Sequence, residues 1–542
     1  MVKFLSTTKR VIFARQKDIL SSALILALMI VVSRLFGFLR YRTLATYFSK
    51  EELDIFLASF RLPDFVFEVL VSGALTAAFI PIFIKYEKNS KELHNNISSI
   101  INFIMLGLTA FLVVIYLLSG FIIPLITPGM SESDIDTIIK LSRVLLIGQL
   151  PILVVGHILS GVAQANKIFI ITAIAPILYN LGIILGTILF APTLGLYGPV
   201  IGVVLGSVFF LISQIPIIFI TKFKYYLYSF NKKILHEFVT LFLPRFFSVI
   251  TAQIDLTIDM SLSTLLGPGS YTIFFFAQHL QFFPVAFIGM AFGQASLPYL
   301  SDLYKEKKIE DLKKLFIDSC LQLLFLTVPL AIFFIFARTP IVRFFFGGEK
   351  FDWEGTVLTA KTMSYFALSI PLHTLFYFIT RAFYATFDTK TPFIINVASI
   401  AVNTLLSLLF IFVFHLPVWS LAIAFSISIS INVIVLFILF YKKIGTFSLK
   451  RLFFNTFKIC IASGVSALLS YPIMKLFDVL ILDTSRTINI FFLISIVFGI
   501  YMSVYLFLAW LINIEEIYIL KSVLGKIKQT KKDNVEINTN IT

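Results

Sequence analysis

Long apolar runs, separated by short polar connections, repeat along the whole chain. Each run is about 20 residues or longer, the length that an α-helix needs to cross the hydrocarbon core of a bilayer. The pattern predicts an all-α polytopic membrane protein with about fourteen transmembrane helices. The predicted spans are 19–40, 55–84, 96–125, 136–163, 167–191, 196–221, 236–266, 271–300, 312–337, 357–384, 391–414, 417–441, 452–474 and 488–514. No small-residue cleavage site follows the first run, which we interpret as a retained helix.

The connections between the runs alternate in charge. Lysine and arginine gather before the first span and after every second one, whereas most intervening connections are short or acidic. Basic connections stay in the cytoplasm, so the pattern predicts cytoplasmic termini and an even number of spans. The connection 338–356 breaks the rule because it carries Arg338, Arg343 and Lys350 on the outer side. We expect it to form a small folded external loop.

Two pairs of segments resemble each other across the chain. Residues 72–93 resemble 289–312, with Pro81 aligned to Pro298, and 161–185 resembles 381–409. The copies run in the same sense, which predicts two six-helix lobes related by a parallel repeat, with a substrate site between them. The predicted organisation is a cytoplasmic N-terminus (1–18), an N-lobe (19–222), a C-lobe (235–442), two additional C-terminal helices (452–514) and a basic cytoplasmic tail (515–542).

Composition supports a membrane protein and excludes several other classes. Hydrophobic residues make up 58% of the chain and charged residues 13%, against about 25% charged in a typical soluble protein. The net charge of +15 fits basic loops on anionic lipid, and without a basic stripe or nucleic-acid motif we expect no nucleic-acid partner. Cys320 and Cys460 lie in separate apolar segments and predict neither a disulfide nor a metal pair. No catalytic constellation or phosphate-binding glycine loop is found, so we expect neither an enzyme nor a bound cofactor.

Arginines occur at the end of the first apolar run, in the sequence SRLFGFLRYRTL. An arginine at the centre of a membrane helix costs about 2.5–3.5 kcal/mol on insertion scales. We expect Arg42 to extend to the outer headgroups. Arg34 lies about 9 Å deeper than Arg40 along the helix, so contact with the headgroups relieves it less. Charge inside a water-filled cavity is the alternative.

Other spans also carry ionisable side chains, which are functional candidates by default. They are Asp54, Arg61, Asp64 and Glu68 at the second span, Arg245, Asp255 and Asp259 in the seventh, and His279 in the eighth. Arg61 and Asp64 have the spacing of a pair on one helical face. Asp255 and Asp259 also share a face, and either a cation, an arginine or protonation must relieve them. His279 lies near Gln278 and Gln281, and three polar residues together favour a helix face that lines a water-filled cavity over a packed interior.

The segment 33–83 resembles the MurJ/MviN family of lipid II flippases. The pattern S-R-x-x-G-F-x-R matches at Ser33, Arg34, Gly37, Phe38 and Arg40, and D-x-F-x-x-x-F-[KR]-L-P matches from Asp54 to Pro63. Further matches are FIPIF, Leu297-Pro298 and DTKTP at 388–392. The resemblance covers about residues 20–515, and with it comes the expectation of fourteen helices, the last two forming a groove for the lipid tail.

The resemblance implies that the chain moves undecaprenyl-linked disaccharide-pentapeptide from the inner to the outer leaflet of the bacterial cytoplasmic membrane by alternating access. Cavity arginines of the family match here at Arg40, with Arg34 as a second family arginine. Phe67 and His279 stand at two other arginine positions, and Ser72 stands where the family often has an acid. We expect the substrate-binding residues to be Arg34, Arg40, Asp54, Arg61, Glu68, Arg245 and His279.

The family's sodium site matches at Asp259, Asp388 and Thr404, with Tyr384 in place of an amide, so sodium is a candidate coupling ion. For Asp388 the sequence alone favours a turn or helix cap. Besides the lipid-linked glycan and membrane lipids, we expect a monomer associated with cell-wall synthesis. The alternative functions are export of another lipid-linked oligosaccharide or an amphipathic cation. A glycosyltransferase, polymerase or ligase would need a larger external loop than 338–356.

Overall fold

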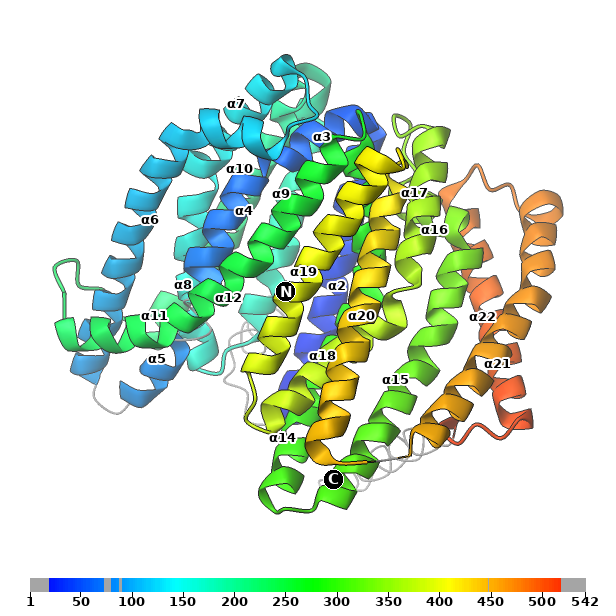
Figure 1. Ribbon diagram of the computed structural model, residues 1–542. Coiled ribbons are helices and arrows are strands. Elements are labelled where there is room, and N and C mark those ends of the chain that lie inside the picture. The colour runs from blue at the N-terminus through cyan, green and yellow to red at the C-terminus, as the bar shows by residue number, and fades with distance from the viewer. Residues whose placement is uncertain (1–18, 73–78, 87–89, 447, 518–542) are drawn as a thin grey trace, which may run out of the picture. The chain divides into compact units, whose positions relative to one another are not determined.

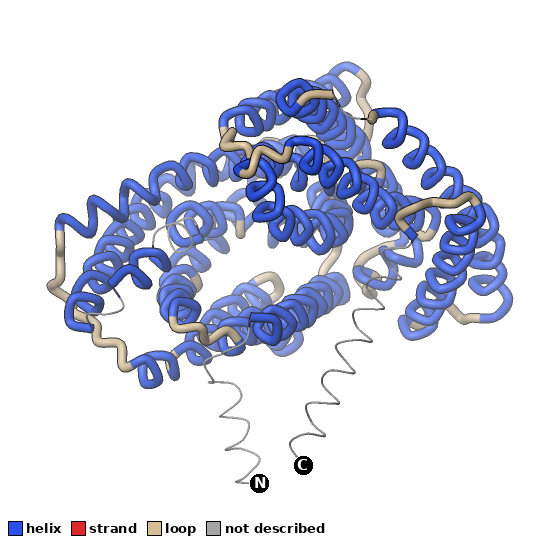
Figure 2. The backbone as a smooth tube through the Cα atoms, turned by 90° about the horizontal axis from the view of Figure 1, so that it is seen from below, coloured by secondary structure: helices blue, strands red, loops and turns tan. Residues whose placement is uncertain are grey.

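The computed structural model describes residues 19–72, 79–86, 90–446 and 448–517, and within these ranges it contains helices and connections but no strand (Figure 2). This confirms the predicted all-α class. The predicted N-terminal segment 1–18, residues 73–78 of the second predicted span, and the tail beyond residue 517 lie outside the described residues.

The chain divides into two compact units, 1–272 with 345–355, and 273–344 with 356–542. The helices of the first, with η marking a π-helical turn, are α2 (Ile19–Tyr47), α3 (Lys50–Ser59), α4 (Arg61–Phe67), η1 (Glu68–Ser72), α5 (Ile80–Tyr86), α6 (Ser90–Ile126), α7 (Glu132–Gly148), α8 (Leu150–Ala165), α9 (Ile170–Leu194), α10 (Tyr197–Gln214), α11 (Pro216–Thr221) and α12 (Lys232–Thr264). Figure 1 labels them from blue to green. The predicted lobes, 19–222 and 235–442, rest on the repeat and stay a prediction.

The second unit contains most of α13 and the helices that follow it (Figure 1). They are α13 (Ser270–Pro284), η3 (Val285–Met290), α14 (Ala291–Lys305), α15 (Ile309–Phe336), α16 (Arg338–Phe346), α17 (Trp353–Ala367), α18 (Ile370–Ala385), α19 (Lys390–Leu408), η4 (Leu409–Val413), α20 (Trp419–Ile444), α21 (Leu449–Leu476), η5 (Phe477–Ile481) and α22 (Thr487–Leu511). The first turn of α13, the last residues of α16 and the first turn of α17 belong to the first unit.

Most of the predicted spans are present as long apolar helices. Among the described residues, ten helices are long and apolar enough to cross a membrane, and the pair α17 and α18, bent by 45°, makes an eleventh. The three predicted spans outside this set, 19–40, 55–84 and 236–266, are those that carry the arginines and carboxylates of the candidate site. Fourteen spans therefore remain a prediction, because parts of these three spans lie outside the residues and side chains that the structure describes.

Small residues allow α9 and α10 to pack backbone against backbone. A Cβ atom added at Gly182 would lie 2.3 Å from the Cα of Gly206, and one at Gly186 would lie 2.2 Å from the Cα of Gly202. Such close approach is typical of membrane helix pairs with small residues every fourth position. This hairpin also packs against α2, the helix that carries the first arginines.

The segment 345–355 lies far along the chain but packs within the first unit. The amide of Phe351 donates to the carbonyl of Ala45 over 3.1 Å, and a Cβ atom at Gly348 would lie 2.2 Å from that same carbonyl oxygen. Lys50 Nζ lies 2.7 Å from Asp352 and 3.4 Å from Glu354. The part 345–355 of the predicted loop 338–356 is therefore fixed at the end of α2 and the start of α3, whereas residues 338–346 form the helix α16.

The core of the second unit joins α15 to α18, α20, α21 and α22. Phe316 packs on Phe378 and Phe440, with ring centroids 5.4 and 4.6 Å apart. Pro329 lacks an amide hydrogen, so the carbonyl of Phe325, one turn earlier, loses its helical donor. The hydroxyl of Tyr505 donates to this carbonyl over 2.9 Å. A buried tyrosine of α22 thus replaces the missing bond and ties the last helix to α15.

Candidate functional site

The arginines of α2 differ in their surroundings. Arg34 is exposed, whereas Arg40 and Arg42 are half-buried. The guanidinium carbon of Arg40 lies 4.3 Å from the ring centroid of Tyr41, whose side chain is buried. A cation over an aromatic face is stabilised by the ring quadrupole, most strongly where water is excluded. Arg40 is therefore a partly desolvated cation that packs against the ring of Tyr41.

Arg61 connects α4 to α12 of the same unit. Its Nη2 donates to the backbone carbonyl of Gln253 over 2.7 Å and to the Gln253 side chain over 2.6 Å. Its Nε donates to the hydroxyl of Thr257 over 2.8 Å. These acceptors are neutral, so they bond the Nε and Nη2 donors of Arg61 without compensating its positive charge. The sequence predicted Asp64 as the partner of Arg61, but the two form no ion pair within 4 Å in the described residues.

Asp64 and Glu68 lie on the segment that follows Arg61. Asp64 is exposed and Glu68 half-buried, and both lie within electrostatic range of Arg61. Arg40 of α2 also acts on Asp64. No hydrogen bond to the Asp64 carboxylate is present across the described ranges, although this residue lies in the middle of a predicted span. The first unit thus brings together two arginines and two carboxylates, which we call the charged cluster: Arg40, Arg61, Asp64 and Glu68.

A π-helical turn begins within this cluster at Glu68. Such turns occur frequently at functional sites because they change the direction of side chains within a helix. The preceding residue, Phe67, packs edge-on against His157 at 4.7 Å, and His157 stacks on Phe210 at 4.5 Å. The position where the sequence predicted a missing family arginine is therefore occupied by an aromatic stack, next to the charged cluster.

Asp54 is buried and has its own set of donors. Its Oδ1 accepts bonds from the amide and hydroxyl of Thr272, at 2.6 and 2.7 Å, and its Oδ2 accepts from the amide of Gly269 at 2.7 Å. The side chain is 3% exposed. This carboxylate holds α3 against the first turn of α13. Its predicted contact with substrate stays a prediction.

The seventh predicted span corresponds to α12. Asp259 is 5% exposed and Asp255 is half-buried, so the two acids on this helix lie in different environments. Arg245 lies on the same helix, and Ser72 ends η1, but the side chains of these two residues lie outside what the structure describes.

His279 lies on α13 in the second unit, among neutral groups. Its Nδ1 is 2.9 Å from the carbonyl of Phe275, and the two rings are 3.9 Å apart. Nearby on the helix, Gln281 donates to Ser369 over 2.9 Å and lies 3.1 Å from Nδ1 of His373. Of the polar residues predicted to line a water-filled cavity, Gln281 therefore lies in a buried hydrogen-bonded group with Ser369 and His373.

The predicted sodium residues have local partners. Asp388 accepts from the amide and hydroxyl of Thr391, at 3.0 and 2.9 Å, and pairs with Lys443 at 2.9 Å. Burial opposes its ionisation, but these bonds outweigh burial and lower the pKa of the Asp388 carboxyl. Thr404 donates to the carbonyl of Ile400 over 2.9 Å. In the described part of the chain no three His, Cys, Asp or Glu side chains form a metal-binding group, and the sodium site stays a prediction.

Two features of the first unit were not predicted from the sequence. Gly269 lies in the connection between the predicted spans 236–266 and 271–300, and Thr272 lies at the start of the second of these, but neither was predicted as a partner of Asp54. Lys50 pairs with Asp352 and Glu354, about 300 residues away. The composition of the loop offered a weak signal, since GGEKFDWEG combines acids with turn-forming glycines, but nothing in one sequence identifies Lys50 as their partner.

Comparison with known proteins gives a consistent result. A family model described as lipid II flippase MurJ matches residues 44–502. A probable lipid II flippase MurJ of Rickettsia prowazekii is 29% identical over 405 residues, covering 72% of this chain and 77% of the relative. The lipid II flippase MurJ of Thermosipho africanus is 29% identical over 396 residues, covering 72% and 80%.

Solved structures agree with the sequence comparison. A lipid II flippase MurJ in an inward closed conformation superposes with a TM-score of 0.74 at 26% identity, covering 90% of this chain and 98% of that one. An inward-facing multidrug resistance transporter of the MATE family and MOP superfamily gives a TM-score of 0.66 at 15% identity, covering 76% and 94%. The second likeness concerns the fold alone.

Proposed function

Because this chain belongs to the MurJ family of lipid II flippases, we propose that it moves lipid II, the lipid-linked precursor of peptidoglycan, from the inner to the outer leaflet of the cytoplasmic membrane. The observation that carries the proposal is the family match across residues 44–502. In this function the chain is a transporter with both termini in the cytoplasm, and it acts by alternating access without making or breaking covalent bonds.

The charged cluster suits a substrate whose headgroup is a pyrophosphate. An anion that crosses hydrocarbon needs cations in a water-filled path, and guanidinium groups bind phosphate oxygens by charge-assisted hydrogen bonds. Arg40 is the proposed principal contact, with Arg34 on the same helix as a second cation. Arg61 contributes charge while its hydrogen bonds to α12 hold it in place.

The carboxylates of the cluster have a role when no substrate is bound. An unpaired arginine at membrane depth is costly, and Asp64 and Glu68 provide negative charge near Arg40 and Arg61. An arriving pyrophosphate competes with these carboxylates for the arginines. This exchange of anions keeps the cations compensated during the whole cycle and allows release of the product.

A complementation experiment tests the function. Bacteria depleted of their own lipid II flippase would express this chain, and an externally added probe would score lipid II in the outer leaflet. We expect growth and outer-leaflet lipid II to be restored, with an empty vector as the control. Failure of rescue, combined with rescue of a different polysaccharide pathway, would reject lipid II as the substrate and favour another lipid-linked oligosaccharide.

We also propose sodium coupling through Asp259, Asp388 and Thr404, on the strength of their match to the family pattern. Asp259→Asn should weaken the dependence of transport on sodium, measured in vesicles with imposed sodium gradients. The exposed Asp136, which pairs only with Lys140 on its own helix, provides Asp136→Asn as a matched control. Unchanged activity of Asp259→Asn across sodium concentration and pH would rule out this site.

A further inference from the structure

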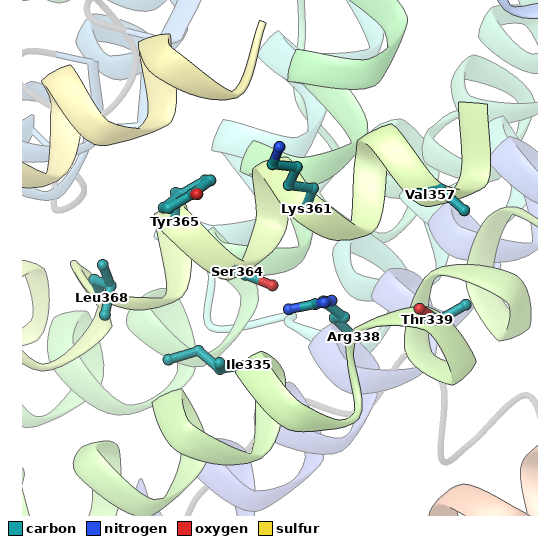
Figure 3. A pocket seen from close by; sticks show the side chains of 8 residues that line it. All are labelled: Ile335, Arg338, Thr339, Val357, Lys361, Ser364, Tyr365 and Leu368. Carbon is teal, nitrogen blue, oxygen red and sulfur yellow. The ribbon is translucent and has the colours of Figure 1, made fainter. Parts of the chain in front are cut away.

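A cavity lies within the second unit, apart from the residues of the candidate site. It has a volume of about 460 Å³ and is bounded by the end of α15, the start of α16 and one face of α17. Figure 3 shows that the guanidinium of Arg338 and the hydroxyl of Ser364 point toward each other across it. Lys361 lines the same cavity and leaves α17 in a different direction (Figure 3).

The two cations of this cavity are not neutralised. Neither Arg338 nor Lys361 forms an ion pair with an acidic side chain in the described residues, and both are exposed. Lys361 Nζ instead lies 4.7 Å from the ring centroid of Trp419. The hydroxyl of Thr339 lines the cavity beside Arg338. Two uncompensated cations with hydroxyl groups alongside are the donors that a phosphate group takes.

The rest of the lining is apolar and open. Ile335 and Leu368 line the cavity with the cations, and the side chain of Leu368 is 56% exposed. The cavity lies at the end of the second unit where α20 begins with Trp419. Tryptophan is enriched at the membrane–water interface, and α20 ends with Lys442 and Lys443, the basic side of the unit. The positive-inside rule therefore assigns the cavity to the outer headgroup level.

We propose that this cavity binds the phosphate group of a membrane lipid. Arg338 and Lys361 contact the phosphate, Thr339 donates a further hydrogen bond, and the lipid chains run along Ile335 and Leu368. The phosphate belongs either to an anionic phospholipid or to a polyprenyl diphosphate. The proposed site is separate from the charged cluster of the first unit, so lipid binding can be measured without any transport assay.

Native mass spectrometry of the full-length protein tests the site. The detergent-solubilised protein would be titrated with phosphatidylglycerol, phosphatidylcholine and undecaprenyl diphosphate as separate probes. We expect phosphatidylglycerol or the diphosphate to bind more tightly than phosphatidylcholine. Removing each charge, as in Arg338→Gln and Lys361→Gln, should weaken binding about fivefold, and Arg338→Lys should retain most of it.

Lys475 provides the matched control, because it is an exposed cation near the same end of the unit that does not line the cavity. Lys475→Gln should bind lipid as the unaltered protein does. Preference for the diphosphate alone would identify the substrate lipid as the source, and equal binding of both anionic lipids would identify the phosphate as the recognised group. Equal affinity of the unaltered protein and of a variant that carries both Arg338→Gln and Lys361→Gln, or equal binding of phosphatidylcholine, would overturn the proposal.

Discussion

The two units of this protein handle charge in opposite ways. In the first unit, arginines and carboxylates lie within the predicted spans, on α2, α4 and η1, with Asp64 open to solvent. In the second unit, the ion pairs lie near helix ends, as Lys443 with Asp388 and Arg451 with Asp318 and Glu515. On α13 of the second unit, His279 contacts the carbonyl and ring of Phe275, and Gln281 donates to Ser369.

This difference shows that a repeat in sequence does not require a repeat in chemistry. Charge within a span is expensive, and a unit that carries it needs a function to retain it. Apart from Arg338 and Lys361 of the cavity described above, the second unit has the more ordinary arrangement, in which ion pairs join helix ends and connections. We therefore expect the first unit to carry most of the anion binding, and the substitutions below test this division.

The largest expected effect is that of Arg40→Ala. Loss of the principal contact to a pyrophosphate should reduce transport at least about 30-fold, since truncating one partner of a desolvated charge pair costs about 2–5 kcal/mol. Outer-leaflet lipid II in depleted cells measures the effect, with membrane expression checked by immunoblot. Arg42→Ala is the matched control on the same helix and should stay active. An active Arg40→Ala variant would show that Arg40 is not the principal contact of the anion.

Asp54→Asn should affect stability more than chemistry, because this acid of the first unit is buried and structural. The amide offers one oxygen in place of two, so Gly269 or Thr272 loses a charge-assisted bond, each worth about 1.5–3 kcal/mol. The midpoint of thermal unfolding in detergent should fall. Glu132→Gln, an exposed acid of the same unit, should leave it unchanged. An unaltered midpoint for Asp54→Asn would show that Asp54 is not a structural residue.

Asp388→Asn should show the smaller, pH-dependent stabilisation typical of the second unit. The pKa of Asp388 is lowered on folding, so its contribution is fully present above the ordinary carboxyl pKa of 3.8. It is lost as the pH falls through the lower folded-state value. Asp388→Asn should therefore lower the free energy of unfolding by about 1 kcal/mol or less. The resulting difference in unfolding temperature between the variant and the unaltered protein should shrink on acidification. A difference independent of pH would contradict the assignment.

His279→Gln should have the smallest effect. The amide can replace the contact with the carbonyl of Phe275, and no charge is lost if this position acts as a neutral residue. Transport should fall less than about threefold, which is under 1 kcal/mol. A loss comparable to that of Arg40→Ala would show that His279 supplies a charge. It would contradict the expectation that the first unit carries most of the anion binding.

Much of the helical architecture was predictable, because apolar length is a strong and local signal. The eleven candidate spans found in the described residues all fall on predicted ones. The other three predicted spans, 19–40, 55–84 and 236–266, include residues or side chains that the structure does not describe, so the search does not test them. The motif around Arg34 and Arg40 was also recognisable from sequence, because charged residues stand out against an apolar background.

The partners of individual side chains were less predictable. The spacing of Arg61 and Asp64 indicated a pair on one helix, yet Arg61 bonds to α12, about 190 residues away. Helical periodicity reports which residues share a face, and it contains nothing about which helix packs there. The bonds of Asp54 to Thr272 and of Lys50 to Asp352 have the same origin, because tertiary contacts between distant segments decide them.

The close contact of α9 with α10 has a consequence for the synthesis of the protein. The two helices are consecutive and joined by a short connection, so their glycine surfaces meet as soon as both have entered the membrane. At about 5–20 residues per second, the ribosome needs on the order of tens of seconds to add the rest of the chain. We expect this hairpin to form early and to offer α2 a finished surface, so that the arginine-bearing helix is sheltered by protein while the second unit is still being made.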